Sequence, residues 1–152
     1  MVTITKTAEQ LKEELEAICD HNIQSGFGSL EYILRREIVE INIKEAYVDY
    51  KFVIPKEASN ETNTAHGGYI AAMLDESMGY TARVLVCNGD TVKTADMNFN
   101  CLAPGIIGEE GILHVSVIKS GKRLVVLRGE MYQGDRLISI GTGSYARVEY
   151  SK

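Results

Sequence analysis

The chain has 152 residues, of which 45% are hydrophobic and 24% charged, and its formal net charge is −5. This length suits one domain that buries its own core without disulfide or metal staples, so we expect residues 1–152 to form a single domain. The acidic balance argues against a nucleic acid or an anionic membrane as partner, because phosphate-rich surfaces are bound by basic faces.

The three cysteines, Cys19, Cys87 and Cys101, are far apart and form no Cys-x-x-Cys pair. This spacing argues against a zinc ribbon or a dithiol redox site, and free thiols are typical of a reducing cytosol. The polar N-terminal sequence lacks the apolar core of a signal peptide, and no apolar run approaches the ~20 residues that span a bilayer. We therefore expect a cytoplasmic protein that binds no metal.

The first predicted element is a helix over residues 7–22. Thr7 and Gln10 have the spacing of a capping box, and apolar residues recur at three- and four-residue steps (Ala8, Leu11, Leu15, Ile18). The Gly- and Ser-rich segment 25–29 ends it. This first part of the chain, residues 1–28, would be a helix and its connection. Strands are predicted over residues 30–43 and 46–54, with a tight connection at 44–45 and Pro55 closing the second run.

A polar loop over residues 56–65 leads into a second predicted helix, residues 66–85. Only Asp75, Glu76 and Arg83 bring charge to this helix. A helix that is apolar on most sides is a buried helix, so we expect this one to be buried. Five of its residues group toward one side (Ile70, Met73, Leu74, Ser77, Met78). A turn is predicted at residues 87–90.

The rest of the chain predicts four strands, over residues 91–100, 111–120, 123–133 and 136–150. Breaks fall at 104–105, 120–122 and 134–135. Short connections favour antiparallel neighbours, so we expect a meander after the helix, with one or two strands before it. The predicted class is α+β, with an antiparallel sheet wrapped around a central helix.

The start of the second helix has the properties of an anion-binding site. Gly67 and Gly68 let a ligand approach the backbone, and the first N–H groups of a helix lack internal partners at its positive end. Such an N–H can stabilise a developing oxyanion. Alternatively, the two glycines only let this helix end pack closely. His66 could be a base or a substrate contact, although a structural or positioning role is favoured.

Asp75 lies in the middle of this apolar helix. A buried carboxylate is costly unless it is paired, so its presence calls for a reason. Ala71 and Gly79, one turn away on either side, leave space above its side chain. A carboxylate in such a cleft can serve as general base or nucleophile. The alternative is that Asp75 faces water beside Glu76.

Taken together, these residues resemble those of the hotdog-fold acyl-CoA thioesterases. The pattern is Asn60, six positions before His66-Gly67-Gly68, and Asp75, nine positions after His66. Matching segments follow in order at 94–99, 102–104 and 119–122, and the resemblance covers residues 33–148. It is greatest to the branch that contains the phenylacetyl-CoA thioesterases of aromatic degradation and the small mitochondrial acyl-CoA thioesterase of animals.

The resemblance implies a long central helix wrapped by an antiparallel sheet of five to six strands, here with an additional N-terminal helix. That helix could cover the core or line the acyl pocket. Family members are homodimers, often paired into homotetramers, with active sites at the dimer interface. The start of the central helix in one subunit would then face Asp75 of the other.

The resemblance also implies roles for single residues. Asp75 would activate water or act as nucleophile, the Gly67 N–H would polarise the thioester carbonyl, and Asn60 would position water or the carbonyl. Thr94 keeps a hydroxyl where some relatives carry a supporting serine. Relatives in another branch use a glutamate on this helix, but Glu76 is turned about 100° from Asp75.

The turn Ser120-Gly121-Lys122-Arg123 resembles the part of the family that meets the pantetheine and nucleotide phosphates of coenzyme A. Two cations beside a turn suit phosphate, although they could equally be solvated hairpin charges.

The expected function is hydrolysis of an acyl-CoA, with no cofactor beyond the coenzyme A of the substrate. A non-catalytic module that binds acyl-CoA is one alternative. A hotdog hydratase or dehydratase is another, but the His followed by Phe-Pro that marks many of these enzymes does not occur.

Overall fold

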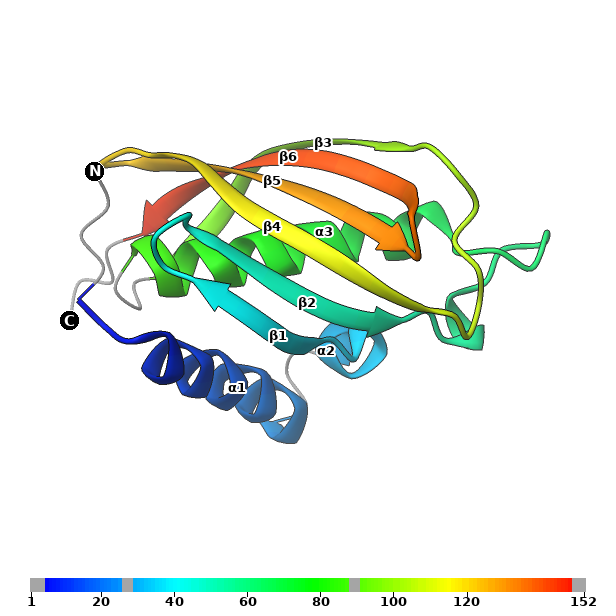
Figure 1. The fold of residues 1–152 in the computed structure, drawn as a ribbon, viewed down its shortest axis with the longest axis horizontal. Coiled ribbons are helices and arrows are strands. Elements are labelled where there is room, and N and C mark those ends of the chain that lie inside the picture. Colours follow the sequence, from blue (N-terminus) through cyan, green and yellow to red (C-terminus); the bar gives the residue numbers. More distant parts are fainter. Residues whose placement is uncertain (1–4, 26–28, 88–90, 149–152) are drawn as a thin grey trace.

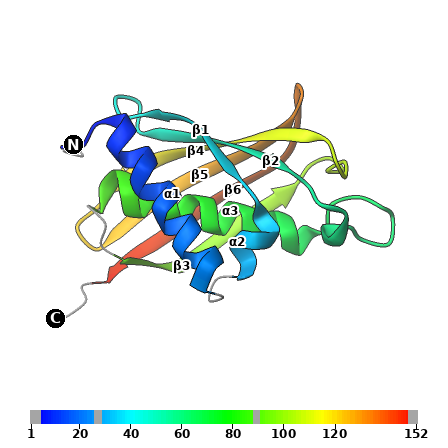
Figure 2. The ribbon, with the colours of Figure 1, turned by 90° about the horizontal axis from the view of Figure 1, so that it is seen from below.

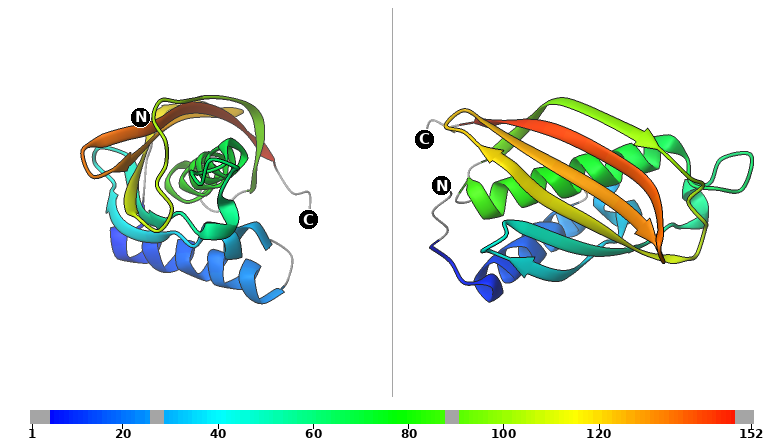
Figure 3. Two further views of the ribbon diagram at one scale, coloured as in Figure 1. Left: turned by 90° about the vertical axis from the view of Figure 1, so that its right-hand side faces the viewer. Right: turned by 45° about the horizontal axis from the view of Figure 1, so that its top comes forward.

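In a computed structural model, which describes residues 5–25, 29–87 and 91–148, a six-stranded antiparallel sheet curves around one helix. This helix, α3 (Gly67–Thr81), lies inside the curve, as the end-on view of Figure 3 shows. Helices α1 (Ala8–Ser25) and α2 (Ser29–Leu34) lie on the open side of the sheet (Figure 1). The predicted α+β hotdog fold, with its N-terminal helix, is confirmed.

The strand order is β1-β2-β4-β5-β6-β3. The six strands are β1 (Glu37–Asn42), β2 (Tyr47–Val53), β3 (Thr91–Cys101), β4 (Glu110–Ser120), β5 (Leu124–Gln133) and β6 (Arg136–Val148). The four strands predicted after the central helix are confirmed to within one or two residues where the structure describes them. The predicted antiparallel meander is confirmed only for β4, β5 and β6. Strand β3 pairs with β6 and not with β4, so it lies at an edge of the sheet. Residues 102–109 carry the chain from β3 across the end of the sheet to β4 (Figure 1).

The predicted strand over residues 30–43 is wrong in its first part. Residues 29–34 form α2, and β1 begins only at Glu37. Tertiary contacts favour the helix here, because α2 buries Leu34 and places the Glu31 carboxylate 2.8 Å from the Arg36 guanidinium. The strand predicted over 46–54 is confirmed as β2, whose inward side chains Val48, Tyr50 and Phe52 are buried.

Helix α1 begins with the predicted capping box. The Thr7 N–H donates to Gln10 Oε1 at 2.9 Å, and the Gln10 N–H donates to Thr7 Oγ1 at 3.2 Å. The side chains of its residues Leu11 and Leu15 are fully buried, and the helix crosses the open side of the sheet (Figure 2). It continues to Ser25, three residues beyond the prediction. Most of the predicted turns at 25–29 and 87–90, and the end of the strand predicted to reach 150, lie outside the described residues.

The predicted helix 66–85 is confirmed as α3 and the π-helical turn Ala82–Val86 that continues it. His66 caps its start, and the apolar side predicted from the sequence is buried against the sheet (Ile70, Met73, Leu74, Ser77, Met78). In the part of the chain that the structure describes, no helix combines the length and the apolar character needed to cross a membrane.

Candidate active site

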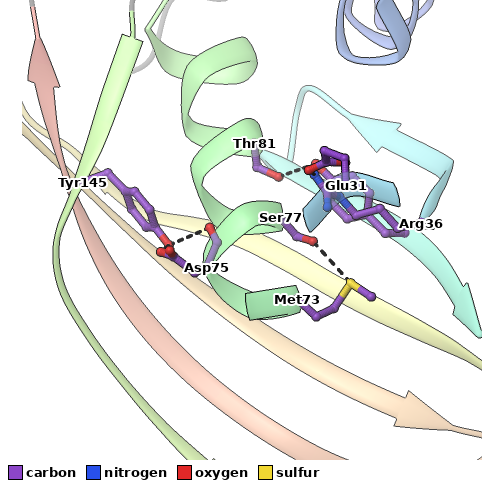
Figure 4. Close-up of polar contacts among 8 residues, drawn as sticks. Glu31, Arg36, Met73, Asp75, Ser77, Thr81 and Tyr145 are labelled. Atoms are coloured by element: carbon purple, nitrogen blue, oxygen red, sulfur yellow. Dashed lines mark hydrogen bonds and ion pairs between the residues drawn. The ribbon is translucent and has the colours of Figure 1, made fainter. Parts of the chain in front are cut away.

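Two hydroxyl groups hold the carboxylate of Asp75. Its Oδ1 accepts a hydrogen bond of 2.9 Å from Thr94 Oγ1 and one of 3.0 Å from the phenol of Tyr145. Tyr145 also donates to the backbone carbonyl of Asp75 at 3.0 Å, and Figure 4 shows its ring reaching the helix from the sheet. Among the described residues, these hydrogen bonds to the carboxylate all end on Oδ1 and none ends on Oδ2. One carboxylate oxygen is therefore fixed and the other is open.

Both hydroxyl groups come from neighbouring strands of the sheet. Thr94 on β3 is paired directly with Tyr145 on β6, so the two side chains project from one position of the ladder toward α3. Burial raises the pKa of Tyr145, and the negative charge of Asp75 raises it further. Tyr145 therefore remains a hydrogen-bond donor to the carboxylate throughout the physiological range.

Asp75 lines a cavity of about 180 Å³ beside β3 and β6. Its walls include Glu76, Gly79, Tyr80, Arg83, Thr94 and Tyr145. Gly79 lies one turn after Asp75, where the sequence predicted space. A Cβ added there would lie 3.5 Å from the Tyr145 ring. Asp75 is half-buried and hydrogen-bonded, so the alternative in which it simply faces water is wrong.

The start of α3 keeps one backbone donor open. His66 Nδ1 accepts the Gly68 N–H at 2.9 Å, which gives His66 a capping role. The Gly67 N–H has no acceptor among the described residues. A Cβ added at Gly67 would meet nothing within 4 Å, so the packing of this chain does not require glycine there. The N–H is thus available to a group that this chain does not supply.

Asn60 organises the loop that precedes α3. Its Oδ1 accepts the backbone N–H groups of Thr62 and Thr64 at 3.0 and 3.1 Å, and its Nδ2 lies 3.0 Å from Thr64 Oγ1. Asn60 and Gly67 line a second cavity, of about 430 Å³, together with Cys101 and Pro104. Asn60 therefore faces the same cavity as Gly67.

The predicted site residues fall into two groups that one chain keeps apart. Asp75 and Thr94 line one cavity, and Asn60 and Gly67 line the other. Gly67 and Asp75 are eight positions apart on one helix, which is about 12 Å of helix axis. An oxyanion donor must lie close to the reacting oxygen, so the two groups of a single chain cannot act on the same carbonyl.

The predicted coenzyme turn connects β4 to β5. The Gly121 N–H donates to the Leu124 carbonyl at 2.8 Å, and Arg147 Nη2 donates to Ser120 Oγ at 2.9 Å. Lys122 and Arg123 are exposed. Because Val125 pairs with Tyr145, the turn projects from the end of the sheet that carries the Asp75 site.

Sequence reasoning missed Tyr145 and Arg147. Tyr145 is 70 residues from Asp75, and no local motif marks it. The available signal was a buried polar-tipped side chain in an alternating strand, which needs a hydrogen-bond partner.

Comparison with known proteins decides the family. The model of the thioesterase superfamily matches residues 62–140, a segment that holds Gly67, Asp75 and Thr94. This chain belongs to the thioesterase superfamily. The thioesterase resemblance predicted from the sequence is confirmed.

Individual relatives agree with the family. Mouse (Mus musculus) acyl-coenzyme A thioesterase 13 is 31% identical over 71 residues, which are 47% of this chain and 50% of the mouse protein. The chain thus matches about half the length of this relative. The structure of the E. coli PaaI protein from the phenylacetic acid degradation operon has a TM-score of 0.74 at 16% identity, covering 91% of this chain and 96% of that one.

A Streptococcus mutans protein whose structure was determined with bound acetyl-CoA has a TM-score of 0.68 at 19% identity. The superposition covers 77% of this chain and 91% of the streptococcal chain. At these identities the likeness to solved structures shows the fold.

Proposed function

We propose that this protein hydrolyses acyl-CoA thioesters with Asp75 as its catalytic carboxylate. The observation that carries the proposal is the geometry of Asp75, which lines the cavity and whose Oδ1 is held by Thr94 and Tyr145, while Oδ2 accepts no hydrogen bond from the described residues. A carboxylate fixed in this way is pre-oriented to take a proton from water. Membership of the thioesterase superfamily, the name of the mouse acyl-coenzyme A thioesterase and the acetyl-CoA bound to the streptococcal protein support this substrate class.

In the proposed reaction, Asp75 removes a proton from a water molecule whose oxygen attacks the thioester carbonyl carbon. The Gly67 N–H stabilises the oxyanion that forms, with Asn60 positioning the water or the carbonyl and His66 holding the helix start. Collapse of the tetrahedral intermediate breaks the C–S bond and releases coenzyme A as its thiolate. Asp75 could alternatively attack the carbonyl directly, forming an anhydride that water then hydrolyses.

The reaction as proposed takes place between two subunits. Each chain holds Asp75 and the Gly67 N–H in different cavities, and a homodimer could place one chain's helix start opposite the other chain's Asp75. Strand β3 supports this arrangement, because it is an edge strand with an open hydrogen-bonding side and carries Thr94. We propose a homodimer of this kind, which can pair into a homotetramer.

Coenzyme A is proposed to lie along the Ser120–Arg123 turn, where Lys122, Arg123 and Arg147 supply positive charge. The reaction needs no cofactor beyond the coenzyme A of the substrate. The cytoplasm is the proposed compartment, because the three cysteines form no disulfide with one another within the described part of the chain.

A free-thiol release assay on a panel of acyl-CoAs tests the hydrolase. Asp75→Asn keeps the shape of the side chain but removes the base, so it should lower kcat by about 10²- to 10⁴-fold while coenzyme A still binds. The matched control is Asp135→Asn, an exposed aspartate in the turn between β5 and β6 that does not line the cavity. Unchanged turnover in Asp75→Asn would overturn the mechanism. Binding without any turnover in the wild type would instead favour a binding module, and hydration of an enoyl-CoA would favour a hydratase.

Subunit complementation tests the shared site. Gly67→Pro removes only the N–H, since proline suits the first position of a helix and His66 already has an extended backbone with φ −65° and ψ 136°. Mixed with Asp75→Asn chains, it should form heterodimers with one intact site each, restoring about a quarter of wild-type activity if chains assort at random. Two inactive variants that stay inactive after unfolding and refolding together would contradict a shared site. Gly67→Ala, which keeps the N–H, is the control for steric effects.

A further inference from the structure

A third cavity, of about 440 Å³, lies between α1, α2 and the first two strands. We call it the Arg36 chamber, because Arg36 lies at its base among Leu15, Cys19, Ile23, Ile38, Tyr50 and Tyr80. Figure 4 shows Arg36 on the opposite side of α3 from Asp75 and Tyr145. Its volume falls in the usual range for small-molecule sites, and no residue assigned to hydrolysis lines it.

The base of the chamber offers hydrogen-bond donors without acceptors. The Arg36 side chain is 1% exposed, and its Nη2 donates to Glu31 Oε1 at 2.8 Å. Its Nε and Nη1 are buried, and they have no hydrogen-bond partner among the described residues. A buried donor left without an acceptor is costly, so a ligand oxygen that reaches these two N–H groups by a small shift of the wall side chains would satisfy them.

The aromatic walls hold the guanidinium in place. Its Cζ lies 4.9 Å from the centroid of the Tyr80 ring and 5.6 Å from that of Tyr50. The Tyr50 hydroxyl is fixed in turn by Thr81 Oγ1 at 2.8 Å. Two ring faces and the aliphatic side chains of Leu15, Ile23 and Ile38 suit an apolar or aromatic body. Charged side chains complete the lining (Lys12, Glu16, Asp20, Glu31, Arg35, Glu37).

The local charges decide which polar group fits. The positive charge of Arg36 is already matched by Glu31, which is 5% exposed, and the chamber lining as a whole carries four acidic and three basic side chains. An incoming carboxylate would add a further negative charge to a lining in which acids already outnumber bases. A neutral carbonyl oxygen would accept from the open N–H groups without adding charge.

We propose that the Arg36 chamber binds a small, neutral, largely apolar molecule that carries a carbonyl oxygen, which accepts a hydrogen bond from Arg36 Nε or Nη1. This site is separate from the Asp75 cavity, with which it shares only the wall formed by Tyr80. It does not depend on the proposed hydrolysis.

Benzamide and benzoate test the proposal, because they have the same shape and differ in charge. With methyl-labelled protein, benzamide should shift the Ile23 and Ile38 methyl resonances saturably, and benzoate should bind there at least tenfold more weakly. Equal binding of both compounds, or shifts confined to Val92 in the Asp75 cavity, would overturn the proposal. Unshifted chamber methyls would also overturn it, since they would mean that the chamber holds solvent only.

Two matched variants identify the contacts. Ile23→Trp fills the mouth of the chamber and should abolish benzamide binding. Ile33→Trp on α2 is the control, because Ile33 is similarly exposed (42% against 45%) and does not line the chamber. Arg36→Met combined with Glu31→Gln removes both charges together and should weaken benzamide about tenfold, the loss of a hydrogen bond to a charged group. Undiminished affinity in either test variant would overturn the proposal, and Ile23→Trp suffices if the double variant does not fold.

Discussion

Tyr145 donates a 3.0 Å hydrogen bond to the carboxylate of Asp75 across 70 residues of sequence, and this contact connects the last strand of the sheet to the central helix. Thr94 donates to the same oxygen from the paired position on β3. The proposed catalytic carboxylate is therefore oriented by the sheet and not by its own helix.

Tyr145→Phe should lower kcat/KM for acyl-CoA hydrolysis about tenfold, because a hydrogen bond to a charged group is typically worth ~1.5–3 kcal/mol. Thr94→Val should act in the same direction, whereas Thr94→Ser should retain most activity because it keeps the hydroxyl. Steady-state kinetics check this, with Tyr132→Phe as control, since Tyr132 lies on β5 and lines neither the Asp75 nor the Gly67 cavity. Full activity in both Tyr145→Phe and Thr94→Val would show that orientation by the sheet is unimportant.

The double variant Lys122→Ala, Arg123→Ala should raise KM for acyl-CoA several-fold and leave kcat unchanged. The two exposed cations attract the phosphates of the substrate, so the difference from wild type should shrink as salt is added. An acyl-N-acetylcysteamine thioester has no phosphates and provides the control. An equal KM increase for that substrate would argue against phosphate recognition by this turn.

Gly111→Ala should destabilise the fold by about 2 kcal/mol or more, because the new methyl would overlap the Phe52 ring and the backbone oxygen of Tyr132. Gly67→Ala should cost nothing and can gain about 0.5 kcal/mol, since its methyl meets no atom of the chain and alanine favours a helix. Chemical denaturation of the two variants measures the difference. Similar free energies of unfolding would contradict the packing described for Gly111.

Glu76→Gln should stabilise the protein at neutral pH. Burial is the main reason that the pKa of Glu76 is raised above its usual value of 4.5, and the neighbouring Glu31 adds to this effect. A raised folded-state pKa means that the folded protein favours the protonated, neutral carboxyl of Glu76. The favourable effect of the neutral carboxyl on folding is therefore present at acidic pH and is lost as the pH rises through the folded-state pKa.

The advantage of Glu76→Gln should therefore disappear as the pH falls toward 4.5 and below, where the Glu76 carboxyl of the wild type is itself neutral. Thermal unfolding across this range tests the prediction, with the exposed Glu13→Gln as control. An advantage that grows on acidification would have the wrong sign.

The sequence predicted what local patterns encode. The capping box at Thr7 and Gln10 formed as its spacing requires, because each partner lies within one helical turn. A carboxylate in an apolar helix singles out Asp75, the family resemblance singles out Thr94, and the structure joins the two by a hydrogen bond.

The errors arose where distant contacts decide the structure. Residues 30–34 are a short apolar run, which periodicity alone cannot assign to helix or strand, and burial of Leu34 and the pairing of Glu31 with Arg36 favour the helix. The edge position of β3 depends on its long pairing with β6. Tyr145 could not be assigned to the site because no local pattern connects it to Asp75.

Asp75 and Glu76 are consecutive, yet α3 turns them toward different neighbours, Asp75 to the hydroxyls of β3 and β6 and Glu76 to Glu31. Adjacent side chains on a helix point in directions about 100° apart. The surroundings of each acid are therefore set by its position along the helix and not by its chemistry. Deleting one residue between Gly68 and Asp75 would bring Glu76 to the hydroxyl pair and turn Asp75 out of it. A single deletion would therefore give Glu76 the surroundings of Asp75, and a single insertion would give Asp75 those of Glu76, each a larger change than substituting either acid.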